Sequence, residues 1–154
     1  MKRVIDYSEL PGVAGEALPC SSWHLVSQEQ IDRFADATGD HQWIHVDAER
    51  AGREIGGTIA HGFLTLAMLT PLSAETLDFT GVSRRINYGL DRLRFTSPVK
   101  AGGRVRLAHR IVKVEPKAGG LAFSRECQVE IENGTRPALT CEWIILVFPV
   151  TALA

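Results

Sequence analysis

The sequence predicts an α+β fold in which helices come first and an antiparallel sheet follows. From Ser27 to Leu77 apolar residues recur at helical spacing, whereas the stretch from Ser83 to Phe148 is mostly an alternation of polar and apolar residues. One expected helix is apolar on nearly every face, which predicts a buried helix free to lie against the sheet. Because the 154 residues contain no linker or repeat, we expect a single domain spanning residues 1–154.

The first helix is expected to begin after Ser27. The segment Ser27-Gln-Glu-Gln30 has the form of a capping box, with Ser27 as the N-cap and Gln30 at the third helical position. Apolar residues around Phe34 then follow helical spacing, and Gly39 ends the helix because glycine readily adopts the left-handed conformation of a helix terminus.

Two further helices are expected before the sheet. Asp47 caps a short helix that runs through Arg53 and ends at Gly56-Gly57. The third helix covers roughly Gly62 to Leu77 and is the apolar one. Pro71 lies inside it, which predicts a kink or a break near Thr70 because proline cannot donate the helical hydrogen bond.

The strands are separated by a bend and two turns. Ser97–Gly103 contains proline and two glycines, Lys117–Gly120 has the composition of a turn, and Glu132-Asn-Gly134 is a hairpin signal. The expected order is a meander. Its clearest strand segments are Arg92–Thr96, Arg104–Val114, Phe123–Ile131 and Leu139–Phe148.

Composition argues against several classes of protein. A net charge of −1 leaves no general basic field, so we expect neither nucleic-acid nor membrane-surface binding. The apolar stretch around Phe63–Leu72 is too short to span a bilayer, and acidic residues near the N-terminus replace the apolar run of a signal peptide, so a cytoplasmic protein is expected. The three cysteines lack CxxC spacing, which predicts reduced, mostly buried thiols and neither a disulfide framework nor a zinc site.

The segment after Gly39 carries the chemistry. Asp40 and His45 lie five positions apart, and on a loop after a helix stop the two side chains can converge on one water molecule for acid–base catalysis. A glycine then opens the apolar helix at Gly62, where a free backbone N–H can stabilise a developing oxyanion.

These motifs identify a family resemblance. Gly39-Asp40-x-x-x-x-His45, followed by Ala60-His61-Gly62-Phe63-Leu64, resembles the MaoC-like dehydratases, which include the (R)-specific enoyl-CoA hydratases. The resemblance covers most of the chain, including the Phe95–Gly102 bend, and implies a hot-dog fold, in which an antiparallel sheet wraps a long central helix, normally as a dimer. Where the usual family loop has Asn-Pro, this chain has Gln42-Trp43, a variant similar to the nodulation-protein-N-like branch.

The resemblance implies a hydro-lyase that adds water reversibly to trans-2-enoyl thioesters and gives (R)-3-hydroxyacyl thioesters. Asp40 and His45 are the implied acid–base pair, and the backbone N–H of Gly62 is the implied oxyanion donor. We expect His61 to fix the loop by a hydrogen bond and Trp43 to be a packing anchor or pocket wall. The candidate substrate-binding residues are Gln42, Trp43, His61 and Thr70.

Two alternatives remain open at this point: a thioesterase on the same fold, and a non-catalytic accessory protein that binds acyl thioesters. The expected substrate is carried by coenzyme A or by an acyl carrier protein, with no other cofactor and no metal, because the thioester itself activates the alkene. A helix that is apolar all round and the edges of a sheet of about five strands both need covering, which predicts a homodimer or a multiple of it.

Overall fold

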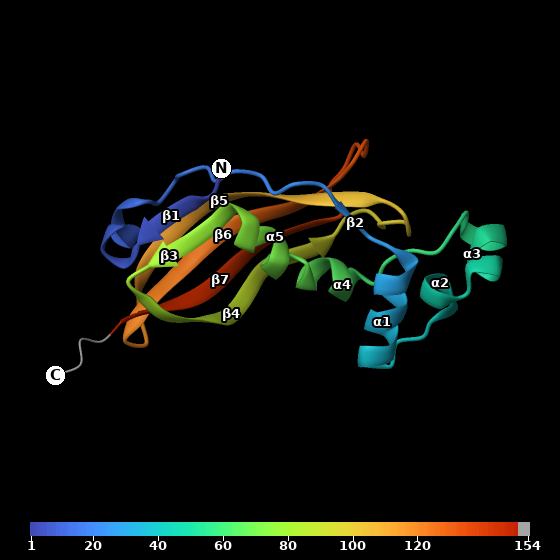
Figure 1. Cartoon of the computed structure of the whole chain (residues 1–154), viewed down its shortest axis with the longest axis horizontal. Helices are drawn as coiled ribbons and strands as arrows, with labels where there is room; N and C mark the ends of the chain where they lie inside the picture. The colour runs from blue at the N-terminus through green and yellow to red at the C-terminus, as the bar shows by residue number, and fades with distance from the viewer. Residues whose placement is uncertain (151–154) are drawn as a thin grey trace.

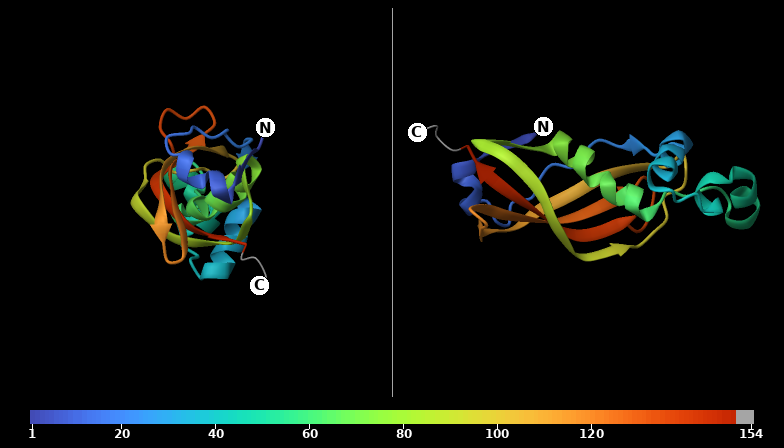
Figure 2. Two further views of the ribbon diagram at one scale, coloured as in Figure 1. Left: turned by 90° about the vertical axis from the view of Figure 1, so that its left-hand side faces the viewer. Right: turned by 90° about the horizontal axis from the view of Figure 1, so that it is seen from below.

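The computed structural model describes residues 1–150. A curled antiparallel sheet wraps a central helical segment, and three helices gather at one end of the elongated molecule, beyond the sheet (Figures 1 and 2). The helices are the 3-10 helix η1 (Tyr7–Gly12), α1 (Gln28–Thr38), α2 (Trp43–Val46), α3 (Ala48–Ile55), α4 (Gly62–Ala67) and α5 (Leu69–Thr76). The strands are β1 (Arg3–Asp6), β2 (His24–Leu25), β3 (Leu77–Thr80), β4 (Val82–Phe95), β5 (Arg104–Lys117), β6 (Gly120–Ile131) and β7 (Leu139–Pro149).

The helix ends follow the local sequence signals. The Ser27 hydroxyl accepts a hydrogen bond from the backbone N–H of Gln30 at 3.2 Å, and Gly39 closes α1 in the left-handed conformation with φ 78°. The Asp47 carboxylate accepts from the backbone N–H of Arg50 at 2.9 Å to start α3, which Gly56 ends with φ 75°. The two predicted helices are therefore confirmed, and the one-turn helix α2 between them was not predicted.

The central helix is broken in two near Thr70, as Pro71 predicted, with the break at Met68. Proline has no N–H to donate to the carbonyl four residues earlier, which is that of Ala67, so the hydrogen-bond ladder is interrupted one turn before the ring. One face, which includes Leu64 and Leu72, is buried, whereas Phe63, Ala67 and Thr70 on the opposite face are exposed in the single chain. The prediction that this helix is buried on all sides is therefore wrong for the single chain.

The large sheet has the order β2-β5-β6-β7-β4, and a parallel pair of β1 and β3 lies beside it. Strands β5, β6 and β7 form the predicted meander, through a two-residue turn with positive φ at Ala118 and Gly119 and through a longer loop over 132–138. The expectation of one continuous meander is wrong for β4, which pairs with β7 and not with β5, its successor in the chain. The bend from Phe95 to Gly103 carries the chain across the open side of the curl.

The concave face of the sheet and the buried face of α4 and α5 form the hydrophobic core. Its members include Leu72 from the helix and Leu107, Phe123 and Leu139 from the strands, all of which are fully buried. A curled antiparallel sheet around a central helix fits the hot-dog fold that the resemblance implied. No helix within residues 1–150 combines the length and the hydropathy that crossing a membrane requires.

Candidate active site

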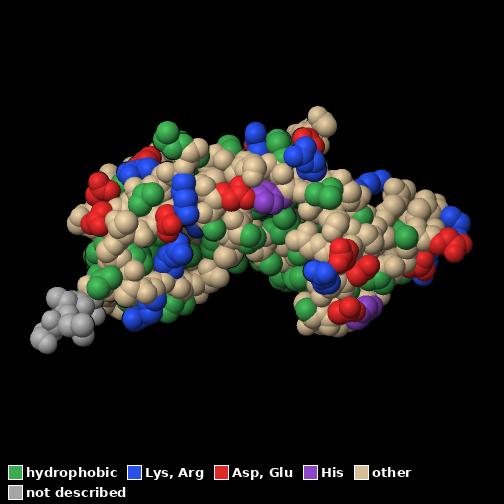
Figure 3. Space-filling model, in the orientation of Figure 1, with side chains coloured by type: hydrophobic (Ala, Val, Ile, Leu, Met, Phe, Trp, Pro, Cys, Tyr) green, Lys and Arg blue, Asp and Glu red, His purple; other side chains and the backbone are tan. Residues whose placement is uncertain are grey.

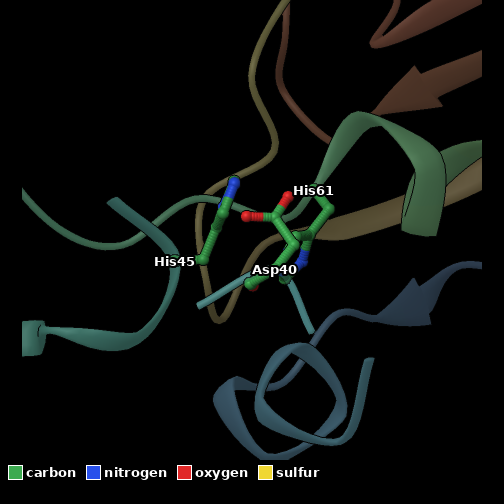
Figure 4. Close-up of side chains that lie close together, drawn as sticks. All are labelled: Asp40, His45 and His61. Carbon is green, nitrogen blue, oxygen red and sulfur yellow. The ribbon is translucent and has the colours of Figure 1, made fainter. Parts of the chain in front are cut away.

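The catalytic loop brings Asp40, His45 and His61 together. Gly39 ends α1, Asp40 follows in the loop, and the single turn α2 turns the chain back so that His45 faces Asp40. His61 is the N-cap residue of α4. One ligand atom from each side chain lies within 4.8 Å of the other two, and Figure 4 shows the three side chains meeting from these separate segments. The predicted convergence of Asp40 and His45 is present, although His45 is on a helical turn and not on an open loop.

His45 is held in one orientation by its surroundings. Its side chain is 6% exposed, and its ring Nδ1 lies 2.7 Å from the backbone oxygen of Ile59. Because a carbonyl only accepts, Nδ1 carries the proton in this bond and the neutral ring keeps its lone pair on Nε2. The side-chain amide of Gln28 donates to the backbone oxygen of His45 at 2.7 Å. His45 therefore presents a basic nitrogen from a fixed ring.

His61 fixes the position of the Asp40 segment. Its Nε2 donates to the backbone oxygen of Asp40 at 2.9 Å, and its ring stacks on that of His45 with centroids 3.8 Å apart. The Asp40 carboxylate in turn accepts from the backbone N–H of Gln42 at 3.4 Å. His61 Nδ1 is buried and has no hydrogen-bond partner among the described residues.

A cavity of about 360 Å³ opens beside His45 and is mostly apolar. Gly62 lines it as the first residue of α4, and the structure gives its backbone N–H no intrahelical acceptor. A methyl group on Gly62 would approach the ring of Phe95 to 3.1 Å, so glycine allows this aromatic ring to close against the helix start. The lining residues are Ile44, His45, Ile59, Ala60, Gly62, Thr65, Phe95, Thr96, Ser97, Pro98, Val99 and Ala138.

The other predicted binding residues lie outside this cavity. Gln42 is exposed and caps α2 with its backbone oxygen, which accepts from the N–H of His45 at 2.9 Å. Trp43 is half-buried, and the Arg50 guanidinium lies 4.1 Å from its ring centroid. Thr70 is exposed on α5 and lines two further hollows along the helix. None of the three lines the cavity beside His45.

Sequence reasoning missed two residues that support the site. Gln28 donates to the His45 backbone and accepts a short hydrogen bond from the hydroxyl of Thr58. Thr65 lines the cavity and donates from its hydroxyl to the backbone oxygen of His61 at 3.4 Å. Gln28 carried no usable signal, because its partners lie 17 and 30 residues away in the sequence. Thr65 could have been found as the one polar residue on an otherwise apolar turn.

The loop carries two titratable side chains that do not line the cavity, Asp40, which is exposed, and His41. His41 is exposed, and its Nε2 lies 2.9 Å from the Asp36 carboxylate on α1. The hydrogen bond to Asp36 raises the pKa of His41 above its ordinary value. His41 therefore braces the loop against α1 and faces away from the three converging side chains.

Taken as chemistry, the arrangement supplies a carboxylate and a neutral imidazole nitrogen around one small molecule, next to a free backbone N–H and an apolar hollow. Asp40, His45 and His61 are also close enough to hold a metal ion together. The same three groups are equally able to bind a water molecule, which accepts from and donates to such partners.

Comparison with known proteins places the chain among dehydratases. The family model described as MaoC like domain matches residues 11–129. The chain is 44% identical over 147 residues to 3-hydroxyacyl-thioester dehydratase Z of Mycobacterium tuberculosis (strain ATCC 25618 / H37Rv), with 94% of this chain and 97% of that protein covered. It is 47% identical over 154 residues to Nodulation protein N of Rhizobium leguminosarum bv. viciae, with 93% and 91% covered.

Solved structures agree with the sequence matches. The unliganded R-hydratase from Pseudomonas aeruginosa superposes with a TM-score of 0.74 at 25% identity, covering 96% of this chain and 90% of that one. An (R)-hydratase from A. caviae involved in PHA biosynthesis superposes with a TM-score of 0.69 at 20% identity, covering 84% and 95%. The hot-dog fold class is confirmed by these matches.

Proposed function

The chain belongs to the MaoC-like dehydratase family and is a hydro-lyase, and we propose that it adds water reversibly to trans-2-enoyl thioesters to give (R)-3-hydroxyacyl thioesters. The observation that carries the proposal is the convergence of Asp40 and His45 beside an apolar cavity that also contains the Gly62 backbone N–H. The 3-hydroxyacyl-thioester dehydratase named among the relatives supports the thioester class.

The reaction follows from the electronics of the substrate. In a trans-2-enoyl thioester the carbonyl is conjugated to the alkene, so C3 is electrophilic and attack there moves an electron pair onto the carbonyl oxygen as an enolate. The water oxygen bonds to C3, one water proton passes to the Asp40–His45 pair, and the pair delivers a proton to C2. Positioned acid–base groups of this kind contribute roughly 10²- to 10⁴-fold in rate.

His45 and Asp40 share the water in this proposal. The neutral His45 ring keeps its lone pair on Nε2 because Nδ1 is bonded to the Ile59 oxygen. The Asp40 carboxylate accepts from the Gln42 N–H, and its second oxygen is free to accept from the water. His61 acts as a positioning residue, because its bond to the Asp40 backbone fixes the loop.

Gly62 is the proposed oxyanion donor. The enolate oxygen is stabilised by a backbone N–H that is already in place before the reaction, a contribution of roughly 10²- to 10³-fold per donor. A side chain at position 62 would press against the Phe95 ring at 3.1 Å, so a larger residue would have to displace this ring or the start of α4, both of which line the cavity. Because conjugation to the thioester activates the alkene, the proposal requires no metal and no cofactor beyond the coenzyme A or acyl-carrier thioester itself.

We also infer that the working form is a homodimer. Strand β4 pairs with β7 on one side, and among the described residues nothing pairs with its other side. Large apolar side chains on β4 are exposed, including Ile86 at 47% and Tyr88 at 52%, and Phe63 on α4 is exposed at 67%. In Figure 3 hydrophobic side chains gather in the middle of the molecule over α4 and α5. A second copy packed on β4 would cover both surfaces.

The decisive experiment incubates the protein with crotonyl-CoA and with a longer trans-2-enoyl-CoA. Hydration is expected, seen as loss of the conjugated enoyl absorbance without release of free thiol, and chiral analysis of the product should give the (R)-alcohol. Release of free thiol would identify a thioesterase, and no reaction with either compound would favour the binding protein.

A matched pair of variants ties the activity to the site. Asp40→Asn removes the proposed catalytic carboxylate, whereas Asp91→Asn removes an exposed carboxylate on β4, away from the catalytic loop. Loss of hydration in the first variant and retention in the second is the expected result. Equal activity in both variants would remove Asp40 from the mechanism.

A further inference from the structure

Arg125 is a buried cation without an acidic partner. It lies on β6 and points into the curl of the sheet, 1% exposed, and no carboxylate of residues 1–150 forms an ion pair with it. One guanidinium nitrogen donates to the hydroxyl of Ser73 at 2.7 Å and to His109 Nδ1 at 3.1 Å. Its Nε has no partner among the described residues. A buried arginine almost always has an anion beside it, because an unpaired charge is costly to desolvate.

The guanidinium faces a hollow between α5 and the strands β4 and β7. This cavity has a volume of about 240 Å³ and is lined by Thr70, Ser73, Ala74, Phe79, Arg85, Ile86, Asn87, Arg125, Trp143 and Ile145. The only charged groups in the lining are the two arginines. Arg85 has an acidic neighbour, the Asp78 carboxylate at 3.9 Å, but Arg125 has none.

Neutral donors surround the same point. The indole N–H of Trp143 donates to the side-chain oxygen of Asn87 at 3.2 Å, which turns the Asn87 amide nitrogen away from the indole and leaves it free to donate. Ser73 accepts from Arg125, so its hydroxyl proton is available to another acceptor. The face of the guanidinium lies 4.3 Å from the Trp143 ring centroid, which holds its plane. The hollow is thus lined by a cation and two neutral donors, and within residues 1–150 no carboxylate pairs with Arg125 and no acceptor takes its Nε–H.

This hollow is in line with the active site. The cavity beside His45 lies between Gly62 on α4 and Phe95 on β4. The next hollow, of about 290 Å³, lies between Leu66–Thr70 and Asn87–Leu90. The Arg125 hollow lies between Thr70–Ala74 and Arg85–Asn87. Residue numbers rise along the helix as they fall along β4, so the three hollows follow one another along the seam between the two elements, although the first shares no lining residue with the second. The second and third share Thr70, Asn87 and Trp143.

We propose that this seam receives the acyl chain of the substrate and that Arg125, with Ser73 and Asn87, binds a carboxylate at the far end of that chain. The proposal rests on the proposed hydratase function, whose thioester carbonyl lies at Gly62. A carboxylate suits the site because its two oxygens match the planar donor edge of a guanidinium. Although burial lowers the pKa of Arg125 to about 10, the group is still protonated at neutral pH and able to bind an anion.

The length of the chain can be bounded. From Gly62 to Ser73 the helical segment rises about 16 Å at roughly 1.5 Å per residue. An extended chain advances about 1.2 Å per bond, since a three-bond residue spans up to about 3.6 Å, so roughly 13 bonds, with about a dozen carbon atoms between, separate the thioester carbonyl from the carboxylate. The predicted substrate class is therefore a long-chain ω-carboxy-trans-2-enoyl thioester.

The test compares trans-2-enoyl-CoA substrates of equal length that end in a methyl group or in a carboxylate, at short, medium and dodecenoyl length. In the wild-type protein kcat/KM should favour the ω-carboxylate at dodecenoyl length by about 10- to 100-fold, the contribution of a charge-assisted hydrogen bond, and show no such preference at short length. Arg125→Met should bring the ratio of the two substrates close to one, whereas Arg125→Lys should keep part of it. Arg110→Met, an exposed arginine paired with Glu126, is the matched control and should keep the full ratio.

The ratio distinguishes recognition from folding, since a structural defect lowers both rates together. A wild-type ratio near one, or an unchanged ratio in Arg125→Met, would overturn the proposal and leave the hydratase function intact. Hydration of neither substrate would reject the proposed function, and the anion site is then measured alone by calorimetry with free dodecanedioate. Binding by the wild type and by Arg110→Met but not by Arg125→Met supports the site; equal behaviour of the three proteins overturns it.

Discussion

Gln28 contributes both to the stability of the fold and to the orientation of His45, so replacing it by leucine should reduce both. The Gln28 amide donates to the His45 backbone oxygen at 2.7 Å and accepts from the Thr58 hydroxyl, whose residue is 6% exposed. Gln28→Leu keeps the approximate size of the side chain but leaves two buried polar groups without this partner. At roughly 1–3 kcal/mol for each group, the free energy of unfolding should fall by about 2–6 kcal/mol.

The same change should slow catalysis without preventing substrate binding. His45 keeps its bond to Ile59 but loses the bond that fixes its backbone, and a displacement on the order of 1 Å at a catalytic group can cost about 10²-fold in rate. We therefore expect kcat for enoyl-CoA hydration to fall by about 10- to 100-fold with KM changed much less, measured below the melting temperature of the variant.

A neighbouring glutamine on the same helix provides the control. Gln30 contributes its backbone N–H, and not its side chain, to the cap formed by Ser27, so Gln30→Leu should leave both chemical unfolding and kcat close to wild type. A Gln28→Leu protein with wild-type kcat would refute the claim that this amide positions His45. A Gln28→Leu protein as stable as the wild type would show instead that other groups or water form hydrogen bonds with the His45 backbone oxygen and the Thr58 hydroxyl.

Four further outcomes are expected. Asp40→Asn or His45→Ala should lower turnover by at least about 10²-fold with the fold intact by circular dichroism, and the double variant should be little worse; near-wild-type turnover would exclude that residue. Gly62→Ala should lower kcat by about 10²-fold by displacing the oxyanion donor, which unchanged kcat would contradict. Trp43→Ala should lower turnover on every chain length alike and destabilise by about 1–2 kcal/mol, less than a fully buried aromatic would; a shift in chain-length preference would make it a pocket wall instead. Light scattering should report a dimer or a multiple of it, and Tyr88→Lys should weaken the association between protomers. A wild-type monomer at micromolar concentration would reject the interface.

Features set by neighbouring residues could be predicted from the sequence. The caps at Ser27 and Asp47, the stop at Gly39 and the interruption caused by Pro71 each depend on backbone hydrogen bonds within a few residues. The break nevertheless falls at Met68, because the consequence of a missing N–H appears at the carbonyl one turn earlier. Local signals therefore identify the elements and leave their ends uncertain by a turn.

Features that depend on the whole fold could not be predicted in this way. Strand β4 pairs with β7, although β5 and β6 lie between them in the sequence. This pairing joins distant segments and leaves no local signal in the sequence. The parallel pair of β1 and β3 joins segments more than 70 residues apart and carries no local signal. The acid–base pair was predictable only because its two members are close in sequence.

Arg125 differs from these cases, because the sequence contained a signal for it. Phe123, Cys127 and Val129 alternate along β6 and face the core, and Arg125 occupies the same side of the strand. A charged residue at a core position of a regular alternation is costly unless it has a partner. The position itself therefore pointed to a buried cation, although only the tertiary structure places it at the end of the seam beside α5.

The Gln42-Trp43 variation has a physical explanation in how the catalytic pair is held. Asp40 is fixed through the backbone N–H of Gln42 and through its own backbone oxygen, which His61 binds, and His45 is fixed through the backbone oxygen of Ile59. Position 42 contributes only its backbone N–H to these contacts and position 43 contributes nothing, so the contacts do not depend on which side chains occupy the two positions. The Trp43 ring instead lies outside the cavity, and the guanidinium of Arg50 on α3 lies 4.1 Å from the centroid of this ring. The loop can therefore change its outer side chains without moving the acid or the base, and the consequence of the variation falls on the rigidity of the loop, which the uniform response expected of Trp43→Ala measures.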